Sequence, residues 1–158
     1  MMIDSTVHAQ AKLLRDYLNQ LNIVMEEYAK QMGLSYTSLN ILSFIYSSEE
    51  PCTQKMICEH VCLPKQTVNS IITNFYRAGL VELRELPKDR RNKAVRLTEL
   101  GQKYAQENIA FIHQAELSAM EKLDHNLRTA LLEGTKRYKE SFQSLLQQNG
   151  KGLHRVSG

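Results

Sequence analysis

Residues 53–98 decide the fold of this chain, and they read TQKMICEHVCLPKQTVNSIITNFYRAGLVELRELPKDRRNKAVRLT. Thr53 is placed to cap a short helix that continues to Val61. A second helix is expected to begin at Pro64. Proline suits this position because its φ is fixed near the helical value, and the backbone N–H that it lacks would have no partner in the first turn. The second helix ends at Gly79, since glycine readily adopts the left-handed conformation that closes a helix. The stretch therefore begins as helix, turn and helix.

The second helix has two faces of different chemistry. Val68, Ile71, Ile72 and Phe75 follow the i, i+3, i+4, i+7 spacing and predict a buried face. Threonine, asparagine and serine are poor helix formers, so their abundance opposite needs a reason. Gln and Asn can pair with adenine, and Thr can contact the thymine methyl group. Taken alone, this face is explained equally by a helix that reads bases and by an amphipathic helix that merely meets solvent, and the basic hairpin that follows favours the first. The polar face consists of Lys65, Gln66, Thr67, Asn69, Ser70, Thr73 and Asn74.

After Gly79 the spacing indicates strands. One short run, 80–86, carries Leu80, Val81, Leu83 and Leu86, and another, 94–97, carries Ala94, Val95 and Leu97. Residues 88–93, KDRRNK, are expected to form the turn between them. This turn carries four positive charges and one negative charge, which suits contact with phosphates and with the minor groove. The order predicts a winged helix-turn-helix, a DNA-reading unit. The expected fold class is mainly α (α+β), with long helices at both ends.

The segment resembles the MarR family of bacterial transcription regulators. The family's wing pattern, D-x-R-x-x-x-V-x-L-T, is met by Asp89, Arg91, Val95, Leu97 and Thr98. Residues 64–69 followed by 77–81 also look like the family's reader helix. The resemblance implies a cytoplasmic homodimer that binds a pseudo-palindromic operator in double-stranded DNA and releases it on meeting a small molecule. It further implies that Arg91 enters the minor groove and that Asp89 orients it.

These observations define the candidate DNA-binding residues. The reader helix is expected to place Lys65, Gln66, Thr67, Asn69, Ser70 and Asn74 at or beside the bases. The wing is expected to place Arg90 and Arg91 in the minor groove, with Asp89 beside them, and Lys88 and Lys93 on the backbone. In the family, effectors lie between the dimerisation helices and the reader unit. Tyr17, Tyr28, Tyr36 and Phe44 are candidates to line such a pocket, and core packing explains each equally well.

Charge is concentrated in the same stretch. Residues 53–98 hold nine Lys or Arg and four Asp or Glu, a net charge of +5, while the whole chain has +3, which leaves −2 elsewhere. The sequence has no apolar run long enough to span a membrane and no signal peptide, so we expect a cytoplasmic protein. It has no glycine-rich phosphate loop, no Gly-x-Ser-x-Gly and no His-Glu-x-x-His, so we expect neither an enzyme nor a cofactor.

Long helices flank the reader unit. Apolar residues from Val7 to Met32 alternate in spacings of four and three, a heptad-like seam that calls for a partner helix. Thr98 and Asp124 are placed to cap two helices, one running from Glu99 to about Lys122 and one carrying Leu127 to Leu145. Residues 1–33 and 99–148 are therefore expected to be dimerisation helices around a winged helix-turn-helix at 34–98. The reader helix would span about 64–78, the wing about 80–98, and a flexible tail 149–158.

Two alternatives use the same fold. Cys52, Cys58 and Cys62, with His60 nearby, would suit a metal or redox sensor, although burial of small apolar cysteines is the simpler explanation. In particular, Cys62 would be buried in a tight turn between helices. A winged helix that binds protein instead of DNA would need an acidic or apolar reader face, and the polar face at 65–74 is neither. His113 and Glu116 are expected to be a solvated helical pair.

Overall fold

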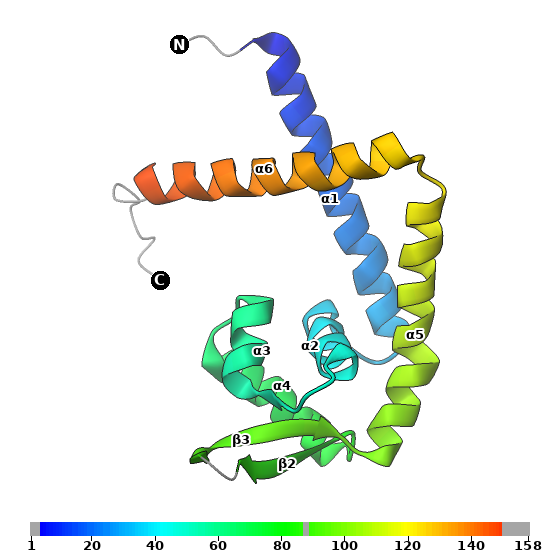
Figure 1. The fold of residues 1–158 in the computed structure, drawn as a ribbon, viewed down its shortest axis with the longest axis vertical. Helices are drawn as coiled ribbons and strands as arrows, with labels where there is room; N and C mark the ends of the chain where they lie inside the picture. Colours follow the sequence, from blue (N-terminus) through cyan, green and yellow to red (C-terminus); the bar gives the residue numbers. More distant parts are fainter. Residues whose placement is uncertain (1–3, 87–88, 150–158) are drawn as a thin grey trace. The chain divides into compact units, whose positions relative to one another are not determined.

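The computed structural model describes residues 4–86 and 89–149. The chain divides into two compact units, Met1–Phe111 and Ile112–Gly158. The elements are, in order, α1 (Ser5–Gln31), α2 (Tyr36–Ser47), β1 (Cys52–Thr53), α3 (Gln54–Val61), α4 (Lys65–Arg77), β2 (Val81–Leu86), β3 (Asp89–Leu97), α5 (Glu99–Glu121) and α6 (His125–Asn149). This mainly helical fold with a small antiparallel sheet confirms the expected fold class (Figure 1).

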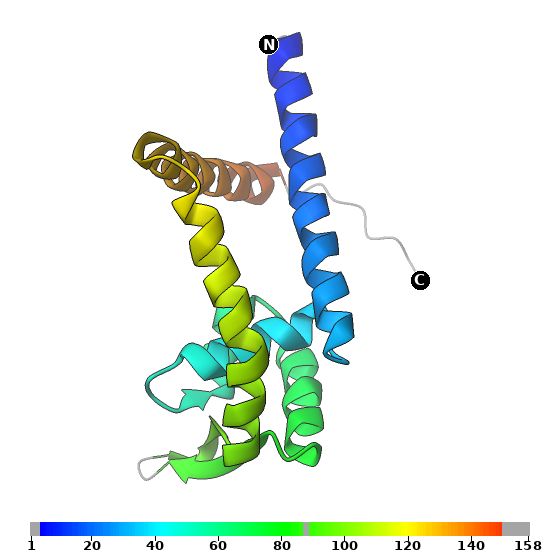
Figure 2. The same cartoon turned by 90° about the vertical axis from the view of Figure 1, so that its right-hand side faces the viewer.

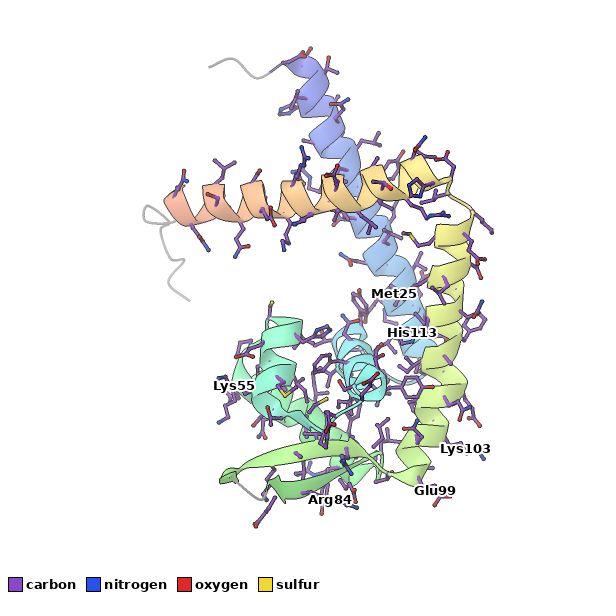
Figure 3. All side chains as sticks on the ribbon, in the orientation of Figure 1. Met25, Lys55, Arg84, Glu99, Lys103 and His113 are labelled. Carbon is purple, nitrogen blue, oxygen red and sulfur yellow. The ribbon has the colours of Figure 1, made fainter. Side chains whose placement is uncertain are left out.

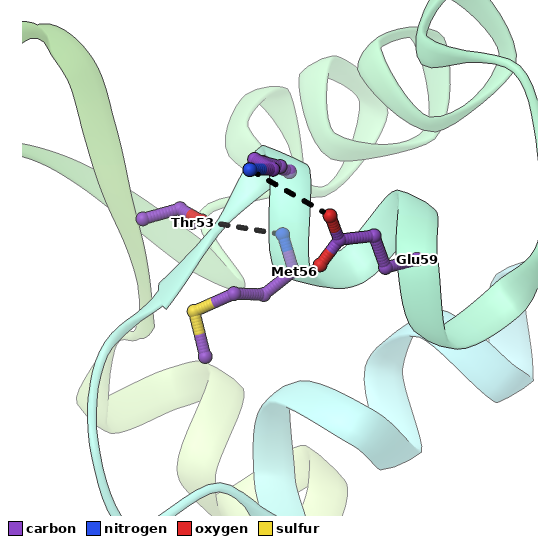
Figure 4. Close-up of polar contacts among 4 residues, drawn as sticks. Thr53, Met56 and Glu59 are labelled. Atoms are coloured by element: carbon purple, nitrogen blue, oxygen red, sulfur yellow. Dashed lines mark hydrogen bonds and ion pairs between the residues drawn. The ribbon is translucent and has the colours of Figure 1, made fainter.

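Side-chain caps set where the helices begin. The Ser35 hydroxyl accepts from the Ser38 N–H at 3.1 Å, and the Thr53 hydroxyl accepts from the Met56 N–H at 3.2 Å (Figure 4). The Thr98 hydroxyl accepts from the Gly101 N–H at 3.0 Å, and the Asp124 carboxylate accepts from the Leu127 N–H at 2.9 Å. Such a cap typically contributes about 1 kcal/mol. All four of these predicted caps are confirmed.

The sheet has the order β1-β3-β2, and all its pairings are antiparallel. Helices α2, α3 and α4 pack over the β2–β3 hairpin, which lies below them in Figure 1 and again in Figure 2. The core between them contains Leu39, Leu42, Ile57, Val68 and Val95, each at most 1% exposed. β1 was not predicted. It is two residues long, and Cys52 pairs with Val95, so its short run carries no periodicity to detect.

The second strand is longer than the sequence predicted. Residues 88–93 were expected to form a turn, but β3 begins at Asp89 and pairs Lys93 with Glu85. The register shifts between Glu85 and Leu86, so the pairing continues through a bulge up to Asp89. This part of the strand reads DRRNK and contains only polar and charged residues. Alternating hydrophobicity was therefore absent, and the prediction of a turn over residues 89–93 was wrong.

Helix α5 packs through a different stripe from the predicted one. Large apolar residues such as Leu100 and Phe111 were expected to be buried, yet they are 58% and 63% exposed. The residues that face the core are Gly101, Ala105 and Ile109. Small side chains allow the helix backbone to approach the core closely, which selects this stripe over the larger one.

Tyrosine side chains join α1 to the first part of α5. The Tyr104 hydroxyl donates to the Met32 carbonyl at 2.9 Å, and the Tyr28 hydroxyl donates to the Asn108 carbonyl at 3.2 Å. The Tyr28 ring also stacks on Phe111 with centroids 6.0 Å apart. Burial raises the pKa of Tyr104, and the neighbouring Tyr28 raises it further. The Tyr104 phenol therefore remains a protonated donor at neutral pH, and the two hydroxyl contacts fix α1 against α5 within the first unit.

The second unit consists of the end of α5 and all of α6. Arg128 donates through Nη1 to the Leu123 carbonyl at 2.7 Å and to the Met120 carbonyl at 3.4 Å, which satisfies carbonyls at the end of α5. Along α6, Leu127, Leu131, Tyr138, Phe142 and Leu145 follow a heptad-like spacing, and all are at least 45% exposed. None of the helices within residues 4–86 and 89–149 is long and apolar enough to cross a membrane.

Candidate nucleic-acid interface

Helix α4 separates its two faces as its spacing predicted. Val68, Ile72 and Phe75 are buried and Ile71 is half-buried. The Thr73 hydroxyl donates to the Asn69 carbonyl at 2.8 Å, so this half-buried side chain is occupied within the helix. The side chains of the other polar residues are exposed, so a partner as large as duplex DNA can reach them. The exposed members of the predicted set are Lys65, Gln66, Thr67, Asn69, Ser70 and Asn74.

The preceding helix and turn position α4. Helix α3 packs against α4, and the Gln54 side-chain amide donates to the Lys65 carbonyl at 3.4 Å. Cys62 has a left-handed φ of 53° and Leu63 N–H donates to the Cys58 carbonyl at 3.3 Å, which closes α3. The chain then reaches the N-cap Pro64 within two residues. The two helices therefore form a helix-turn-helix, in which α3 supports α4.

The other end of α4 is also held. Gly79 has φ +72°, and the Leu80 N–H donates to the Phe75 carbonyl at 2.9 Å. The Thr98 hydroxyl, which also caps α5, donates to the Gly79 carbonyl at 2.5 Å. The exit from α4, the end of the wing and the start of α5 thus meet at one point. A base-reading helix needs such support because its contacts depend on the exact position of its backbone.

Two further residues belong to the exposed surface of α4. Arg77 is exposed and lies seven residues after Ser70 and eleven after Gln66, so it shares their face. Tyr76 is 55% exposed. The site prediction had omitted both, although extending the helical spacing of the polar face by one turn would have found Arg77. With Lys65 and Arg77, α4 carries two positive charges and no acidic side chain.

Only part of the predicted wing site lies within the described residues. Lys93 is exposed on β3. Lys88 and the side chains of Asp89, Arg90 and Arg91 lie outside the described residues, so their predicted roles stay predictions. Arg84 on β2 forms a 2.7 Å ion pair with Glu82, and Figure 3 shows Arg84 on the hairpin. This pair is solvent-exposed, so it contributes little to stability.

The cysteines differ in their surroundings. Cys52 is buried, Cys58 is half-buried and Cys62 is exposed. The prediction that Cys62 is buried in the interhelical turn was wrong, because α3 ends at Val61 and the chain reverses at Cys62. For the same reason Cys62 does not continue the helical face of Cys58. The described part of the chain contains no group of three or more His, Cys, Asp or Glu arranged to hold a metal ion. Met56, also expected inside, is 41% exposed.

Comparisons with known proteins agree with this geometry. A MarR family model matches residues 32–92. A comparison with curated proteins found no match. The fold matches that of a MarR family regulator from Neisseria meningitidis with 26% identity and a TM-score of 0.74, covering 89% of this chain and 98% of that chain.

More distant solved structures share the fold. AbsC, a MarR family transcriptional regulator from Streptomyces coelicolor, has 20% identity and a TM-score of 0.78 over 91% of this chain and 99% of its own. The MepR–DNA complex of S. aureus has 17% identity and a TM-score of 0.70 over 84% of this chain and 97% of its own. The family match covers the helix-turn-helix and most of the wing, and the solved structures show that the chain has the winged-helix fold of MarR family transcription regulators.

Proposed function

We propose that the chain is a homodimeric, sequence-specific DNA-binding regulator that acts as a ligand-responsive repressor. The observation that supports this most is the uncovered polar face of α4. Its side chains are amides, hydroxyls and two cations, and the opposite face is anchored in the core. A solvent-facing helix would gain from paired Glu and Lys residues, whereas a base-reading helix needs donors and acceptors of this kind.

In this proposal the exposed residues of α4 divide into two roles. Gln66, Asn69, Ser70 and Asn74 read or flank base edges, and Thr67 adds a methyl group for thymine contact. The cations at the two ends, Lys65 and Arg77, contact phosphates, and the helix N-terminus near Lys65 favours the same negative charge. From the wing, Arg90 and Arg91 enter the minor groove with Asp89 beside them, and Lys88 and Lys93 contact the backbone.

The proposal of a dimer rests on apolar helix faces that are exposed in the single chain. Leu14, Leu18 and Leu21 on α1 are exposed, as are Leu131 and Phe142 on α6. Patches of this kind on a water-soluble chain usually mark interaction sites. A second copy would cover them, so we propose that α1 and the α5–α6 pair form the dimerisation region. Two-fold symmetry would then place two α4 helices about 34 to 36 Å apart, one turn of DNA.

Relatives of the same fold support DNA binding and ligand control. MepR has been solved in complex with DNA. For BpsR of Bordetella bronchiseptica, which has 19% identity and a TM-score of 0.65, a structure describes regulation of DNA binding by 6-hydroxynicotinic acid. We extend both properties to this chain as part of the proposal.

Selection of bound fragments from random duplex DNA tests the proposal. We expect enrichment of an inverted repeat whose half-site centres are about 10 base pairs apart. Light scattering of the selected complex should give two protein chains per duplex. Recovery of no enriched sequence at low salt, or of a single half-site without symmetry, would contradict the proposal.

Replacing Arg91 with alanine should weaken binding to the selected operator by about 1 to 3 kcal/mol, the range of one good groove contact. The measurement is a mobility-shift titration at fixed salt. Arg137→Ala is the matched control, because it removes the same charge from an exposed α6 ion pair with Glu133. Equal affinity of the two variants would show that the wing arginine does not contact DNA.

Gln66 and Lys93 should give different phenotypes. Gln66→Ala is expected to relax selection at one base pair per half-site, since an amide that reads adenine would be lost. Lys93→Ala should weaken binding to all DNA sequences alike. It should also lower by about one the slope of the logarithm of affinity against the logarithm of salt concentration. Titrations of operator and single-base variants at several salt concentrations separate the two. If Gln66→Ala weakens binding to all DNA sequences equally, Gln66 contacts the DNA backbone and does not read a base.

A further inference from the structure

Thr98 lies at the point where the exit from α4, the end of the wing and the start of α5 meet. It is half-buried and separates Leu97, the last residue of β3, from Glu99, the first residue of α5. In Figure 1, β3 leads directly into α5 at this point. The Thr98 N–H donates to the Leu80 carbonyl at 3.0 Å, so the backbone of the junction is already held without the side chain. The Thr98 side chain is therefore available for a further role.

The Thr98 hydroxyl forms two hydrogen bonds of opposite direction. It accepts from the Gly101 N–H at 3.0 Å, which caps α5, and it donates to the Gly79 carbonyl at 2.5 Å, just beyond the end of α4. Only the first bond is needed for capping, because a cap requires an acceptor alone. Asp124 illustrates this on α6, where a carboxylate caps the helix. The bond to Gly79 is therefore a separate link between α5 and α4.

Helix α4 depends on directional bonds at its ends for its orientation. The apolar side chains of its inner face are buried, but hydrophobic burial has no preferred direction. A hydrogen bond does, since it weakens steeply as its angle departs from linear. At the start of α4 the Gln54 amide donates to the Lys65 carbonyl at 3.4 Å, whereas the Thr98 bond at the other end is 2.5 Å long. The C-terminal end of α4 is thus the more firmly held of the two.

The start of α5 is a firm support for this link. Gly101 is buried, and its backbone approaches the Leu80 carbonyl so closely that a Cβ atom would overlap it. Helix α4 has 13 residues and is therefore roughly 20 Å long. A tilt of about 10° about its C-terminal end would move its first residues by about 3 Å, close to the rise of one base pair. A small rotation at Gly79 thus becomes a displacement of one base-pair step at the start of α4.

We propose that Thr98 is a positioning residue for DNA recognition. Its hydroxyl, by donating to the Gly79 carbonyl, sets the tilt of α4 relative to α5. In a dimer that tilt sets the separation of the two α4 helices, and so the half-site spacing that the dimer accepts. Thr98 acts through α4 and needs no DNA contact of its own. The step from tilt to spacing rests on the proposed function, whereas the tilt itself is a property of the free chain.

Three substitutions separate the link from the cap. Thr98→Val keeps the shape of the side chain and removes both hydrogen bonds. Thr98→Asp keeps an acceptor for the Gly101 N–H, but a carboxylate has no proton to donate to Gly79. Thr98→Ser keeps the hydroxyl and both bonds, so it should behave as the unaltered chain does. Ser35→Ala is the control, because it removes a hydroxyl cap from α2 in the same unit.

Residual dipolar couplings of the backbone amides test the tilt in the free protein, because they give the angle between α4 and α5. We expect Thr98→Val and Thr98→Asp to change this angle by about 10°, the tilt that displaces the start of α4 by one base-pair rise. Thr98→Ser and Ser35→Ala should leave the angle unchanged. An unchanged angle in Thr98→Val or Thr98→Asp, or an equal change in Thr98→Ser, would overturn the proposal.

Mobility-shift titrations at fixed salt test the step from tilt to DNA. The duplexes carry the selected inverted repeat at its selected spacing, or with one base pair inserted or removed between the halves. We expect the unaltered chain and Thr98→Ser to prefer the selected spacing by about tenfold. Thr98→Val and Thr98→Asp should lose this preference or shift it by one base pair. A loss of stability, or the charge that Thr98→Asp adds, weakens binding at all spacings alike, so Ser35→Ala should keep the preference.

The two experiments distinguish failure of the inference from failure of the proposed function. A changed angle with an unchanged spacing preference would refute the step from tilt to spacing. If the unaltered chain binds no duplex with an inverted repeat, the proposed function fails. The dipolar couplings would then still decide whether the Thr98 hydroxyl sets the tilt of α4.

Discussion

Gly101→Ala is expected to lower the free energy of unfolding by about 3 kcal/mol or more. A Cβ atom added at this buried position would overlap the Leu80 carbonyl oxygen and lie 2.8 Å from the Leu80 carbonyl carbon. Neither atom can rotate away, because both belong to the backbone. The Leu80 carbonyl also accepts from the Thr98 N–H at 3.0 Å, so the strand end is held in place. Urea unfolding followed by circular dichroism measures the change.

Gln102→Ala is the matched control. Gln102 is exposed on the same turn of α5 and acquires the same side chain, so we expect a change within about 0.5 kcal/mol. If the two variants are equally stable, α5 does not approach Leu80 as closely as the structure indicates. Because Leu80 directly follows the end of α4, surviving Gly101→Ala protein should also bind operator more weakly.

Leu131→Glu combined with Phe142→Glu is expected to produce monomers and to weaken operator binding by about a hundredfold or more. Both residues lie on the exposed apolar stripe of α6, where a dimer would have to bury the new charges without partners. A monomer would engage each half-site separately and so would lose the gain from linked binding, which is about 10² to 10⁴. Light scattering gives the mass, and mobility shift gives the affinity.

The control places the same two charges on the opposite face of the helix. Thr129→Glu with Gln143→Glu changes two exposed positions about half a turn away from the apolar stripe. We expect this variant to remain dimeric and to bind operator. A dimeric Leu131→Glu/Phe142→Glu variant would remove α6 from the proposed interface, and would leave the assignment of α4 to DNA unaffected.

The predictions from sequence were most accurate where the physics is local. Ser35, Thr53, Thr98 and Asp124 were recognised as caps because a cap needs only a short polar side chain two or three residues before the N–H that it accepts from. The buried face of α4 was recognised because helical spacing alone separates it from the polar face. Arg77 was omitted from the site because the polar face was read only as far as Asn74.

The errors about β1, the buried stripe of α5 and the groove between α2 and the end of α3 arose where a contact joins distant segments. β1 exists only because Cys52 meets Val95 across the sheet. The buried stripe of α5 was misassigned because apolar size was taken as the guide, whereas the close approach of Leu80 selects glycine at 101. The groove beside Phe44 could not be located either. Tyr36 and Phe44 had been named as pocket candidates, but their meeting with His60 depends on how α2 and α3 pack.

The sequence by itself determined the order of the elements, the ends of most helices, the two faces of α4 and the basic character of the wing. Each of these follows from residues within a few positions of one another, through capping, periodicity and charge. Only the tertiary structure decided which face of α5 meets the core, how β1 joins the sheet, and where α2 and α3 leave a groove. These depend on the separation of packed backbones, and that separation is set by the combined volumes of side chains from distant parts of the chain.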